Sequence, residues 1–281
     1  MAETKINFYD VGHGSCTHII TPNNTHILLD IGGGDDMSPA EHLKYFHGVK
    51  ALNALVLTHP HEDHYHDIKN LEKYGLKPKV LSRNNAGFPI QKTDSNKKDH
   101  DKIDCVNDMH KTYIYPVSPE NDPFSPTVNG GVSWKSFRPD SADTTNDDPN
   151  TYSGLYILEF GGIKVVLTGD NNKEIIVRMI ERSDVRTAVK DADFLLAPHH
   201  GRTTDFCPEF FNLVNPRATV ISDKCCEHDS QECSASCYNN GRGVPFNGDT
   251  RHVLTTRSDG NIVLRITDYG GYSFSNWFNR G

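Results

Sequence analysis

Four histidines and two aspartates lie within twelve residues of this chain, in the stretch LTHPHEDHYHDI (57–68). The apolar run LNALVLT (52–58) precedes the first of them and is typical of a strand buried on both faces. Imidazole and carboxylate groups are ligands of zinc and similar divalent metals. The candidate metal ligands of this stretch are His59, His61, Asp63 and His64.

The spacing of these ligands indicates two metals rather than one. On an extended backbone His59 and His61 point to the same side. Asp63 and His64 come in the following turn and can reach a second position. Two metals about 4 Å apart hold a bridging hydroxide, which would be the nucleophile of a hydrolysis. A solvated polar loop is the alternative, and the H-x-H-x-D-H pattern after an apolar strand argues against it.

The overall charge limits the classes of partner. The chain has 281 residues and a formal net charge of -8, which argues against a basic surface that binds nucleic acid nonspecifically. A phosphate substrate stays possible, because bound divalent metals reverse the local field. Seven cysteines are an odd number, and we expect reduced thiols rather than a disulfide framework.

We expect a cytoplasmic protein that does not bind membranes. The chain contains no run of eighteen or more apolar residues, as a membrane-spanning helix would need. Its first residues, MAETKINFYDVG, lack the basic and apolar regions of a signal peptide.

The elements that must position the candidate ligands are strands first, then alternating strands and helices. Strands are expected over 4–11, 16–21, 25–32, 52–58, 112–117, 132–139, 192–199, 217–222, 252–258, 261–268 and 271–278, with a hairpin over 152–170. Helices are expected over 38–46, 66–75, 172–183 and 205–215. Ser38 and Glu41 form a capping-box pattern at the first helix. Residues 83–150 are expected to form long loops or insertions. The order predicts two packed sheets with helices outside.

The stretch THPHEDHYHDI resembles the signature of the metallo-β-lactamase superfamily. Three other segments agree with that family in order: DVGHGSCTHII…HILLDIGGG (10–34), VVLTGD (165–170) and LLAPHHG (195–201). The DVGHGS opening, Asn150 before the hairpin and the PHHG run are most similar to the C-terminal hydrolase domain of the ComEC/Rec2 DNA-uptake proteins. The resemblance implies a four-layer αββα sandwich as a single domain over 1–281, with insertions at about 83–150 and a Cys-rich loop at 224–247.

The resemblance also implies roles for residues far from the signature. Asp170 falls on the metal-bridging aspartate, and His199 falls on the last metal-binding histidine. The third histidine of the first metal has no clear counterpart, since neither His100 nor His110 ends a convincing strand. His200 would then point elsewhere, into the core or toward substrate, where it could protonate a leaving group. Asp63 and His200 are therefore the candidate catalytic residues.

Three further features are candidates for secondary roles. Asp30 could accept the second N–H of a ligand histidine and fix its tautomer. Lys224 and Asn150 are candidate substrate contacts, although Lys224 also fits an ordinary surface lysine. The Cys-rich segment permits a structural zinc or a loop of reduced thiols. Its potential ligands are Cys225, Cys226, His228, Cys233 and Cys237.

These observations predict a metal-dependent hydrolase with two divalent ions, zinc or alternatively manganese. The resemblance implies a phosphodiesterase or nuclease that acts on DNA or a small nucleotide. One alternative is a hydrolase of thioesters, lactones or amides on the same fold. Another is a metal-binding interaction subunit of a larger assembly, such as an antiviral defence system.

Overall fold

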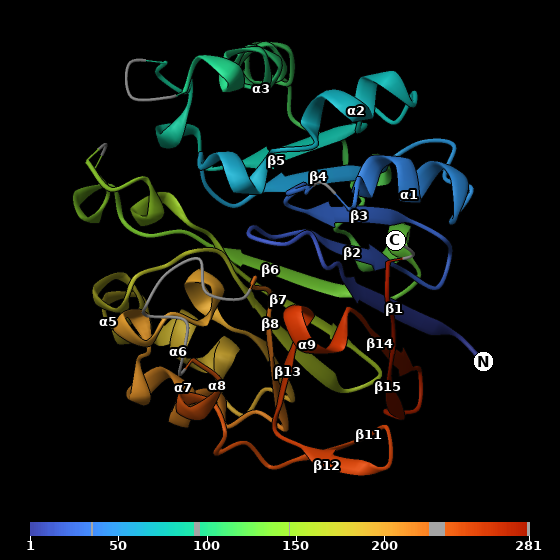
Figure 1. The fold of residues 1–281 in the computed structure, drawn as a ribbon, viewed down its shortest axis with the longest axis vertical. Helices are drawn as coiled ribbons and strands as arrows, with labels where there is room; N and C mark the ends of the chain where they lie inside the picture. The colour runs from blue at the N-terminus through green and yellow to red at the C-terminus, as the bar shows by residue number, and fades with distance from the viewer. Residues whose placement is uncertain (35, 93–95, 146, 225–233, 280–281) are drawn as a thin grey trace.

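A computed structural model describes residues 1–34, 36–92, 96–145, 147–224 and 234–279. Two β-sheets face each other, and helices cover the outer face of each sheet (Figure 1). The predicted four-layer αββα sandwich is therefore confirmed.

The first sheet has seven strands in the order β15-β14-β1-β2-β3-β4-β5. They are β1 (Glu3–Phe8), β2 (Thr17–Ile20), β3 (His26–Leu29), β4 (Ala54–Leu57), β5 (Val80–Arg83), β14 (Asn261–Thr267) and β15 (Tyr272–Trp277). Strand β4 pairs in parallel with both β3 and β5. All four residues of β4 are buried, as expected for an apolar strand covered on both faces.

The second sheet has six strands in the order β13-β10-β9-β8-β7-β6. They are β6 (Ser133–Phe137), β7 (Leu155–Phe160), β8 (Ile163–Thr168), β9 (Phe194–Leu196), β10 (Ala218–Ile221) and β13 (Val253–Thr255). Strands β7 and β8 form the predicted hairpin, and both residues of its Gly161-Gly162 turn have positive φ. The pair β11 (Val244–Phe246) and β12 (Asp249–Arg251) forms a separate small sheet.

Helices form the two outer layers. Those on the first sheet are α1 (Pro39–Tyr45), α2 (Ile68–Lys73) and α3 (His100–Thr112). Those on the second sheet are α5 (Lys173–Glu181), α6 (Ser183–Val189) and α7 (Pro208–Val214). Short helices are α4 (Pro126–Asn129), α8 (Ser234–Cys237) and α9 (Thr256–Asp259). Ser38 caps α1 as predicted, because its hydroxyl accepts a hydrogen bond from the backbone N–H of Glu41.

Short 3-10 turns connect many of these elements. They are η1 (Glu62–His64), η2 (Asn85–Gly87), η3 (Lys97–Asp99), η4 (Pro119–Asn121), η5 (Ser141–Asp143), η6 (Pro149–Tyr152), η7 (Pro198–Gly201) and η8 (Thr203–Asp205).

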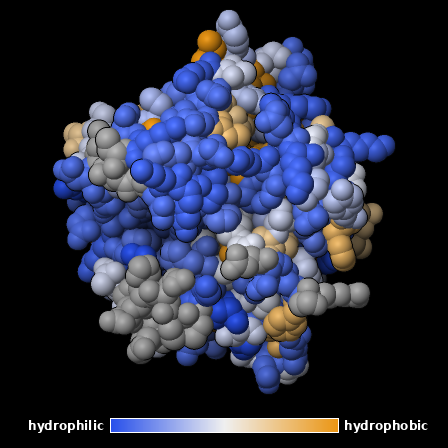
Figure 2. All heavy atoms as spheres, turned by 45° about the horizontal axis from the view of Figure 1, so that its top comes forward, coloured by the Kyte–Doolittle hydropathy of each residue, from blue (hydrophilic) through white to orange (hydrophobic). Residues whose placement is uncertain are grey.

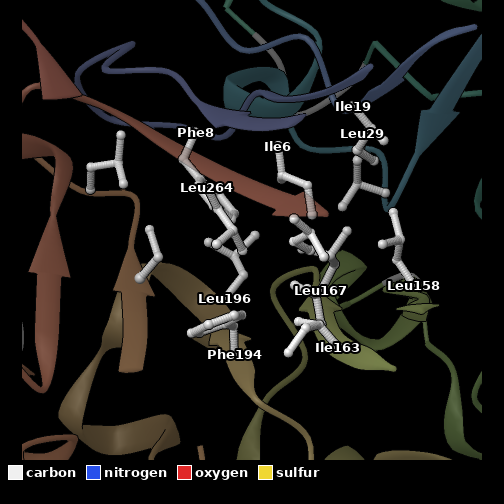
Figure 3. Packing of buried hydrophobic residues seen from close by; sticks show 14 of the residues in the cluster. Ile6, Phe8, Ile19, Leu29, Leu158, Ile163, Leu167, Phe194, Leu196 and Leu264 are labelled. Carbon is white, nitrogen blue, oxygen red and sulfur yellow. The ribbon is translucent and has the colours of Figure 1, made fainter. Parts of the chain in front are cut away.

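The main core lies between the two sheets. Figure 3 shows side chains of the first sheet, such as Ile6, Phe8 and Leu264, packed against Phe194 and Leu196 of the second. Each fully buried side chain of this size contributes about 1.5–3 kcal/mol relative to an exposed one. This apolar layer fixes the relative position of the two sheets, and therefore of the residues at their edges.

The structure corrects the expectations for residues 83–150. No strand forms over 112–117, because α3 continues to Thr112 and the segment after it is irregular. Ile114 and Tyr115 are largely exposed, so the segment has no apolar support for a strand. Helix α3 was not predicted from the sequence. One face of it buries Ile103, Val106 and Met109 against the layer of α1 and α2.

The face that carries α2 and α3 is mainly hydrophilic (Figure 2). Apolar residues on this view appear in small groups rather than as one continuous patch. Within the described part of the chain, each helix is too short or too polar to cross a membrane.

Candidate metal centre

The predicted metal ligands meet where strands of both sheets end. In the first sheet β3 and β4 run parallel, and in the second sheet β8, β9 and β10 run parallel. Parallel neighbours have their carboxyl ends at the same sheet edge, where ligands bind in open α/β sheets. Asp30 follows β3, His59 follows β4, Asp170 follows β8, and His199 follows β9. Segments more than one hundred residues apart in sequence thereby contribute to one cluster.

Hydrogen bonds hold the loop that carries the H-x-H-x-D-H pattern. The carboxylate of Asp30 accepts from both the backbone N–H and the hydroxyl of Thr58, each at 2.8 Å. At the other end of the loop, the backbone N–H of Ser15 donates to the carbonyl of Asp63 at 3.3 Å. Gly32 makes this approach possible, since a Cβ there would lie 2.4 Å from the Asp63 carbonyl oxygen. The Gly-rich turn therefore shapes the loop, as expected.

Four residues place one potential ligand atom each within 4.8 Å of one another: Asp63, His64, Asp170 and His200. The Nε2 atom of His200 lies 3.2 Å from Oδ2 of Asp63 and 3.2 Å from Oδ2 of Asp170. The Nε2 atom of His64 lies 3.3 Å from Oδ1 of Asp170. Ligands that each lie about 2.0–2.2 Å from a zinc ion are separated by similar distances.

The hydrogen bonds of His64 and His200 leave the same ring atom available. Nδ1 of His64 donates to Oδ2 of Asp30 at 2.7 Å, which is the contact expected for Asp30. Nδ1 of His200 donates to the carbonyl of Ser222 at 2.8 Å. Both Nε2 atoms are buried and make no hydrogen bond. In each ring, Nδ1 is held by a hydrogen-bond acceptor, while the buried Nε2 has no hydrogen-bond partner and faces carboxylates. This is the arrangement expected of a histidine that binds a metal through Nε2.

The other predicted histidines also lie near Asp170. Nε2 of His59 is 3.8 Å from Oδ2 of Asp170, and Nε2 of His199 is 3.9 Å from the same oxygen. Nδ1 of His61 lies 3.1 Å from Nε2 of His59. The structure thus places His59 and His199 near Asp170 and His61 beside His59, while the four ligand atoms close enough together to hold one ion are those of Asp63, His64, Asp170 and His200.

The position of His200 corrects the expectation that it would point away from the ligands. Its Nδ1 is bonded to Ser222, and its Nε2 faces Asp63 and Asp170. This arrangement suits a metal ligand. The PHHG pattern did not reveal this, because the directions of the two rings depend on left-handed backbone at both His199 (φ 48°) and His200 (φ 52°).

The ionised carboxylates of the cluster favour a nearby positive charge. Burial raises the pKa of the Asp63 carboxyl, but nearby His64 and His200 outweigh it and hold that pKa below its ordinary value. Burial likewise opposes ionisation of Asp170, and His200 and His64 hold its pKa well below the usual range. Burial lowers the pKa of His200, but Asp170 and Asp63 raise it to about 10. A divalent metal would replace these protons as the source of positive charge.

Sequence reasoning missed one residue beside the cluster. Nε2 of His13 lies 3.6 Å from Oδ2 of Asp63, and its ring centroid is 4.9 Å from that of His200. The DVGHGS segment had pointed to this loop, but its histidine was not singled out.

The remaining candidates lie around or outside the cluster. Asn150 is half-buried in η6, and its backbone N–H bonds to the Asp148 side chain. Lys224 is exposed, and its side chain passes close to Gly12. His110 accepts a hydrogen bond from Arg83 at 2.8 Å. The proposed structural zinc site lies mostly outside the described residues, which include only Cys237 of its potential ligands.

Comparisons relate the chain to known proteins. The family model described as the Metallo-beta-lactamase superfamily matches residues 9–222. ComE operon protein 3 of Bacillus subtilis (strain 168) is 24% identical over 254 residues, which cover 79% of this chain. The chain spans only 28% of that protein.

A solved structure shares the fold at low sequence identity. The metallo-beta-lactamase fold protein YhfI from Bacillus subtilis aligns with a TM-score of 0.51 and 15% identity, covering 94% of this chain and 100% of YhfI. A diphosphatase from the PhnP family aligns with a TM-score of 0.49 and 13% identity, and the alignment covers 94% of this chain and 97% of the diphosphatase.

Proposed function

This chain belongs to the metallo-beta-lactamase superfamily, and from that membership we propose that it is a metal-dependent phosphodiesterase that cleaves DNA or a small nucleotide. At the coarser level it is a hydrolase of this superfamily with a candidate metal site. The observation that carries the proposal is the pair of buried Nε2 atoms of His64 and His200, which make no hydrogen bond and face the carboxylates of Asp63 and Asp170.

When bound, two divalent metals supply an activated water and stabilise negative charge on the phosphoryl oxygens. The chain contributes the ligands and their orientation. Asp170 lies near both His64 and His199, and its carboxylate would help to hold the metals. Asp30 and the Ser222 carbonyl hold the rings of His64 and His200, so that Nε2 of each faces inward. Zinc suits this histidine-rich set, and manganese is the alternative because two aspartates take part.

Resemblance supports a phosphodiester substrate, and the net charge of the chain does not oppose it. The DVGHGS, VVLTGD and PHHG segments resemble the hydrolase domain of DNA-uptake proteins, and ComE operon protein 3 matches 79% of this chain. The net charge of -8 does not oppose an anionic substrate, because bound metals dominate the field close to the site.

The proposal is tested by metal analysis together with hydrolysis assays. Purified protein is assayed on a chromogenic phosphodiester, single-stranded DNA, duplex DNA and cyclic nucleotides, beside chromogenic thioester, lactone and amide substrates. Asp63→Ala and His61→Ala should lose at least a hundredfold in phosphodiester turnover. His100→Ala, on α3, is the matched control and should retain wild-type turnover.

Each contrary result has a defined meaning. Phosphodiester cleavage that persists unchanged in both ligand variants contradicts the proposed site. Turnover restricted to thioesters, lactones or amides favours the alternative hydrolase. Metal binding with no turnover of any substrate favours an interaction subunit. Fewer than two metals per wild-type chain contradicts the two-metal centre.

A further inference from the structure

We propose that Arg257 binds a second phosphate of the substrate, beside the phosphodiester that lies at the metal cluster. The inference rests on the proposed function and narrows its substrate class. The preferred substrate is then a nucleotide strand with more than one phosphate, rather than a cyclic mononucleotide. Its basis is the place of Arg257 in the fold, its uncommitted guanidinium, and the buried carboxylate of Asp223 next to it.

Arg257 follows β13 at the sheet edge where the metal cluster lies. Strand β13 pairs in parallel with β10, and β10 pairs in parallel with β9, so the carboxyl ends of all three share one edge. The PHHG turn follows β9, and Arg257 lies in α9, which begins directly after β13 (Figure 1). Neighbouring strands are about 4.7–4.9 Å apart, so the ends of β9 and β13 are roughly 10 Å apart. A residue after β13 can therefore contact the part of a substrate next to the cluster.

The side chain of Arg257 extends toward the cluster. Its Nη1 atom lies 3.4 Å from Oδ2 of Asp223, and Asp223 follows β10, the strand between β13 and β9. Asp223 comes directly after Ser222, whose carbonyl accepts the hydrogen bond from Nδ1 of His200. The guanidinium therefore lies beside the segment that orients a ligand histidine.

The electrostatics of Asp223 agree with this position. Burial raises the pKa of its carboxyl to about 6, although Arg257 and His200 oppose the rise and Asp10 adds to it. The effect of His200 indicates that Asp223, and with it Arg257, lies within electrostatic range of the metal cluster.

The guanidinium of Arg257 is not committed to hydrogen bonds within the described part of the chain. Its contact with Asp223 is an ion pair in which neither carboxylate oxygen accepts a hydrogen bond. Arg251, at the other end of β13, differs: its Nη1 and Nη2 atoms donate to the two carboxylate oxygens of Asp259 at 3.2 and 3.1 Å. Of these two arginines, Arg257 is the one that keeps its N–H donors available to a ligand.

Asp223 holds the guanidinium without closing it off. Its carboxylate is completely buried, and a buried charge is costly unless an opposite charge lies nearby. Arg257 supplies that charge, while 18% of its side chain stays exposed, so an anion from solvent can reach it. A planar guanidinium can face a carboxylate on one side and donate to a phosphate through its other N–H groups.

A phosphate is the ligand that this arrangement favours. Guanidinium groups bind phosphates through two parallel hydrogen bonds. Arg257 is not one of the four residues whose ligand atoms can hold an ion, so the phosphate that it binds is a neighbour of the one at the cluster. A nucleotide strand provides such a neighbour, and contacts to phosphates fix the register of a strand without reading its bases. Arg257 would thus set which phosphodiester of the strand lies at the metals.

Dinucleotides that differ by one phosphate test the proposal. A thymidine dinucleotide with its single phosphodiester is compared with the same molecule carrying an additional 5′- or 3′-terminal phosphate. Wild-type protein should cleave one of the phosphorylated forms with a KM about tenfold lower, because the added phosphate gains a charged hydrogen-bond partner. Arg257→Gln should reduce this KM ratio to near unity. Arg251→Gln is the matched control and should keep the wild-type ratio.

Binding without turnover gives a readout that does not depend on activity. A fluorescein-labelled thymidine dodecamer is titrated at several salt concentrations in excess chelator, which prevents metal-dependent cleavage. Each phosphate contact of a single strand contributes about 0.7 to the slope of log affinity against log salt. Arg257→Gln should lower the slope by about 0.7, and Arg251→Gln should leave it unchanged. Arg257→Lys should keep the slope but bind more weakly, since lysine retains the charge and lacks the two-pronged donor.

A double variant guards against misfolding of Arg257→Gln, which leaves the buried Asp223 carboxylate without its cation. Asp223→Asn combined with Arg257→Gln removes both charges and should show the same loss of KM ratio and salt slope. Circular dichroism confirms that each variant is folded.

Defined results overturn the proposal. A KM ratio that is equal in the wild type and Arg257→Gln contradicts it, and so does a wild-type protein with no preference for either phosphorylated dinucleotide. An unchanged salt slope in Arg257→Gln also contradicts it. If no phosphodiester is cleaved at all, the proposed function fails, whereas loss of the salt slope in Arg257→Gln would still support Arg257 as a phosphate-binding residue.

Discussion

Nδ1 of His64 donates a 2.7 Å hydrogen bond to Oδ2 of Asp30, and both side chains are fully buried. The same carboxylate accepts two hydrogen bonds from Thr58, the residue that leads into the H-x-H-x-D-H loop. One aspartate at the end of β3 therefore fixes both the loop that begins after β4 and the tautomer of a candidate ligand.

Asp30→Asn should weaken zinc binding by about 10- to 100-fold, because the amide no longer provides a charged acceptor for His64. A competition titration with a chromogenic chelator measures this change. Asp193→Asn is the matched control, since that carboxylate is also buried but bonds to Arg217. Its zinc affinity should equal that of the wild type. An unchanged affinity in Asp30→Asn would contradict the orienting role.

Gly32→Ala should also weaken zinc binding, by about tenfold or more, which corresponds to about 1.4 kcal/mol. The new Cβ would lie 2.4 Å from the carbonyl oxygen of Asp63 and 2.8 Å from that of Ser15, so the loop must move. The same titration measures the effect. In Gly48→Ala nothing lies within 4 Å of the added carbon, and only the strain of a φ of 62° remains. That control should lose about 1–2 kcal/mol of stability at unchanged zinc affinity.

Removal of metal should lower the thermal stability of the protein. Without metal, the half-buried carboxylate of Asp63 and the buried carboxylate of Asp170 lie close together, and a ligand that binds only the folded state stabilises it. At zinc concentrations about 100-fold above Kd the gain is about 2.7 kcal/mol, which raises Tm by several degrees. Thermal melts with zinc and with excess chelator measure it. Asp170→Asn should abolish most of the difference; a full zinc-dependent rise in that variant would argue against this site.

A second group of histidines lies outside the metal cluster. Nε2 of His18 bonds to Nδ1 of His26 at 2.9 Å, and Nδ1 of His18 bonds to the Tyr9 hydroxyl at 2.8 Å. The Tyr9 hydroxyl also bonds to Nε2 of His47 at 3.1 Å. Burial lowers the pKa of His26 to about 4 and that of His18 well below its ordinary value. The network is therefore built for neutral rings.

Acid should destabilise the fold through this network. In the unfolded chain His26 titrates near 6.5, so between pH 6.5 and 4 the unfolded state binds more protons than the folded state. The free energy of unfolding should therefore fall as the pH falls through that window. His26→Asn should reduce the loss between pH 7 and 5 by on the order of 1–2 kcal/mol, measured by urea unfolding. Equal slopes in His26→Asn and the wild type would count against the network.

Local sequence patterns determined much of the architecture. The apolar run of β4, the Ser38 cap of α1 and the glycine turn between β7 and β8 each depend on neighbours in the chain, so residue type and spacing are enough to predict them. The H-x-H-x-D-H pattern likewise predicted a metal-binding loop, because its candidate ligands are adjacent in sequence. Helix α3 was not predicted, because its apolar face is narrow and lies within a polar segment.

Only the tertiary structure decided which side chains meet in the cluster and how their rings are oriented. Parallel strands of both sheets end at one edge, and this brings together Asp30, Asp170 and the PHHG turn. A local sequence pattern cannot predict that residues so far apart in the chain lie close together in space. The directions of His199 and His200 depend on a left-handed backbone and on two acceptors, Asp205 and Ser222, contributed by different segments. Residue types specified the chemistry of this protein, whereas the packing of the two sheets determined which ring nitrogen faces which carboxylate.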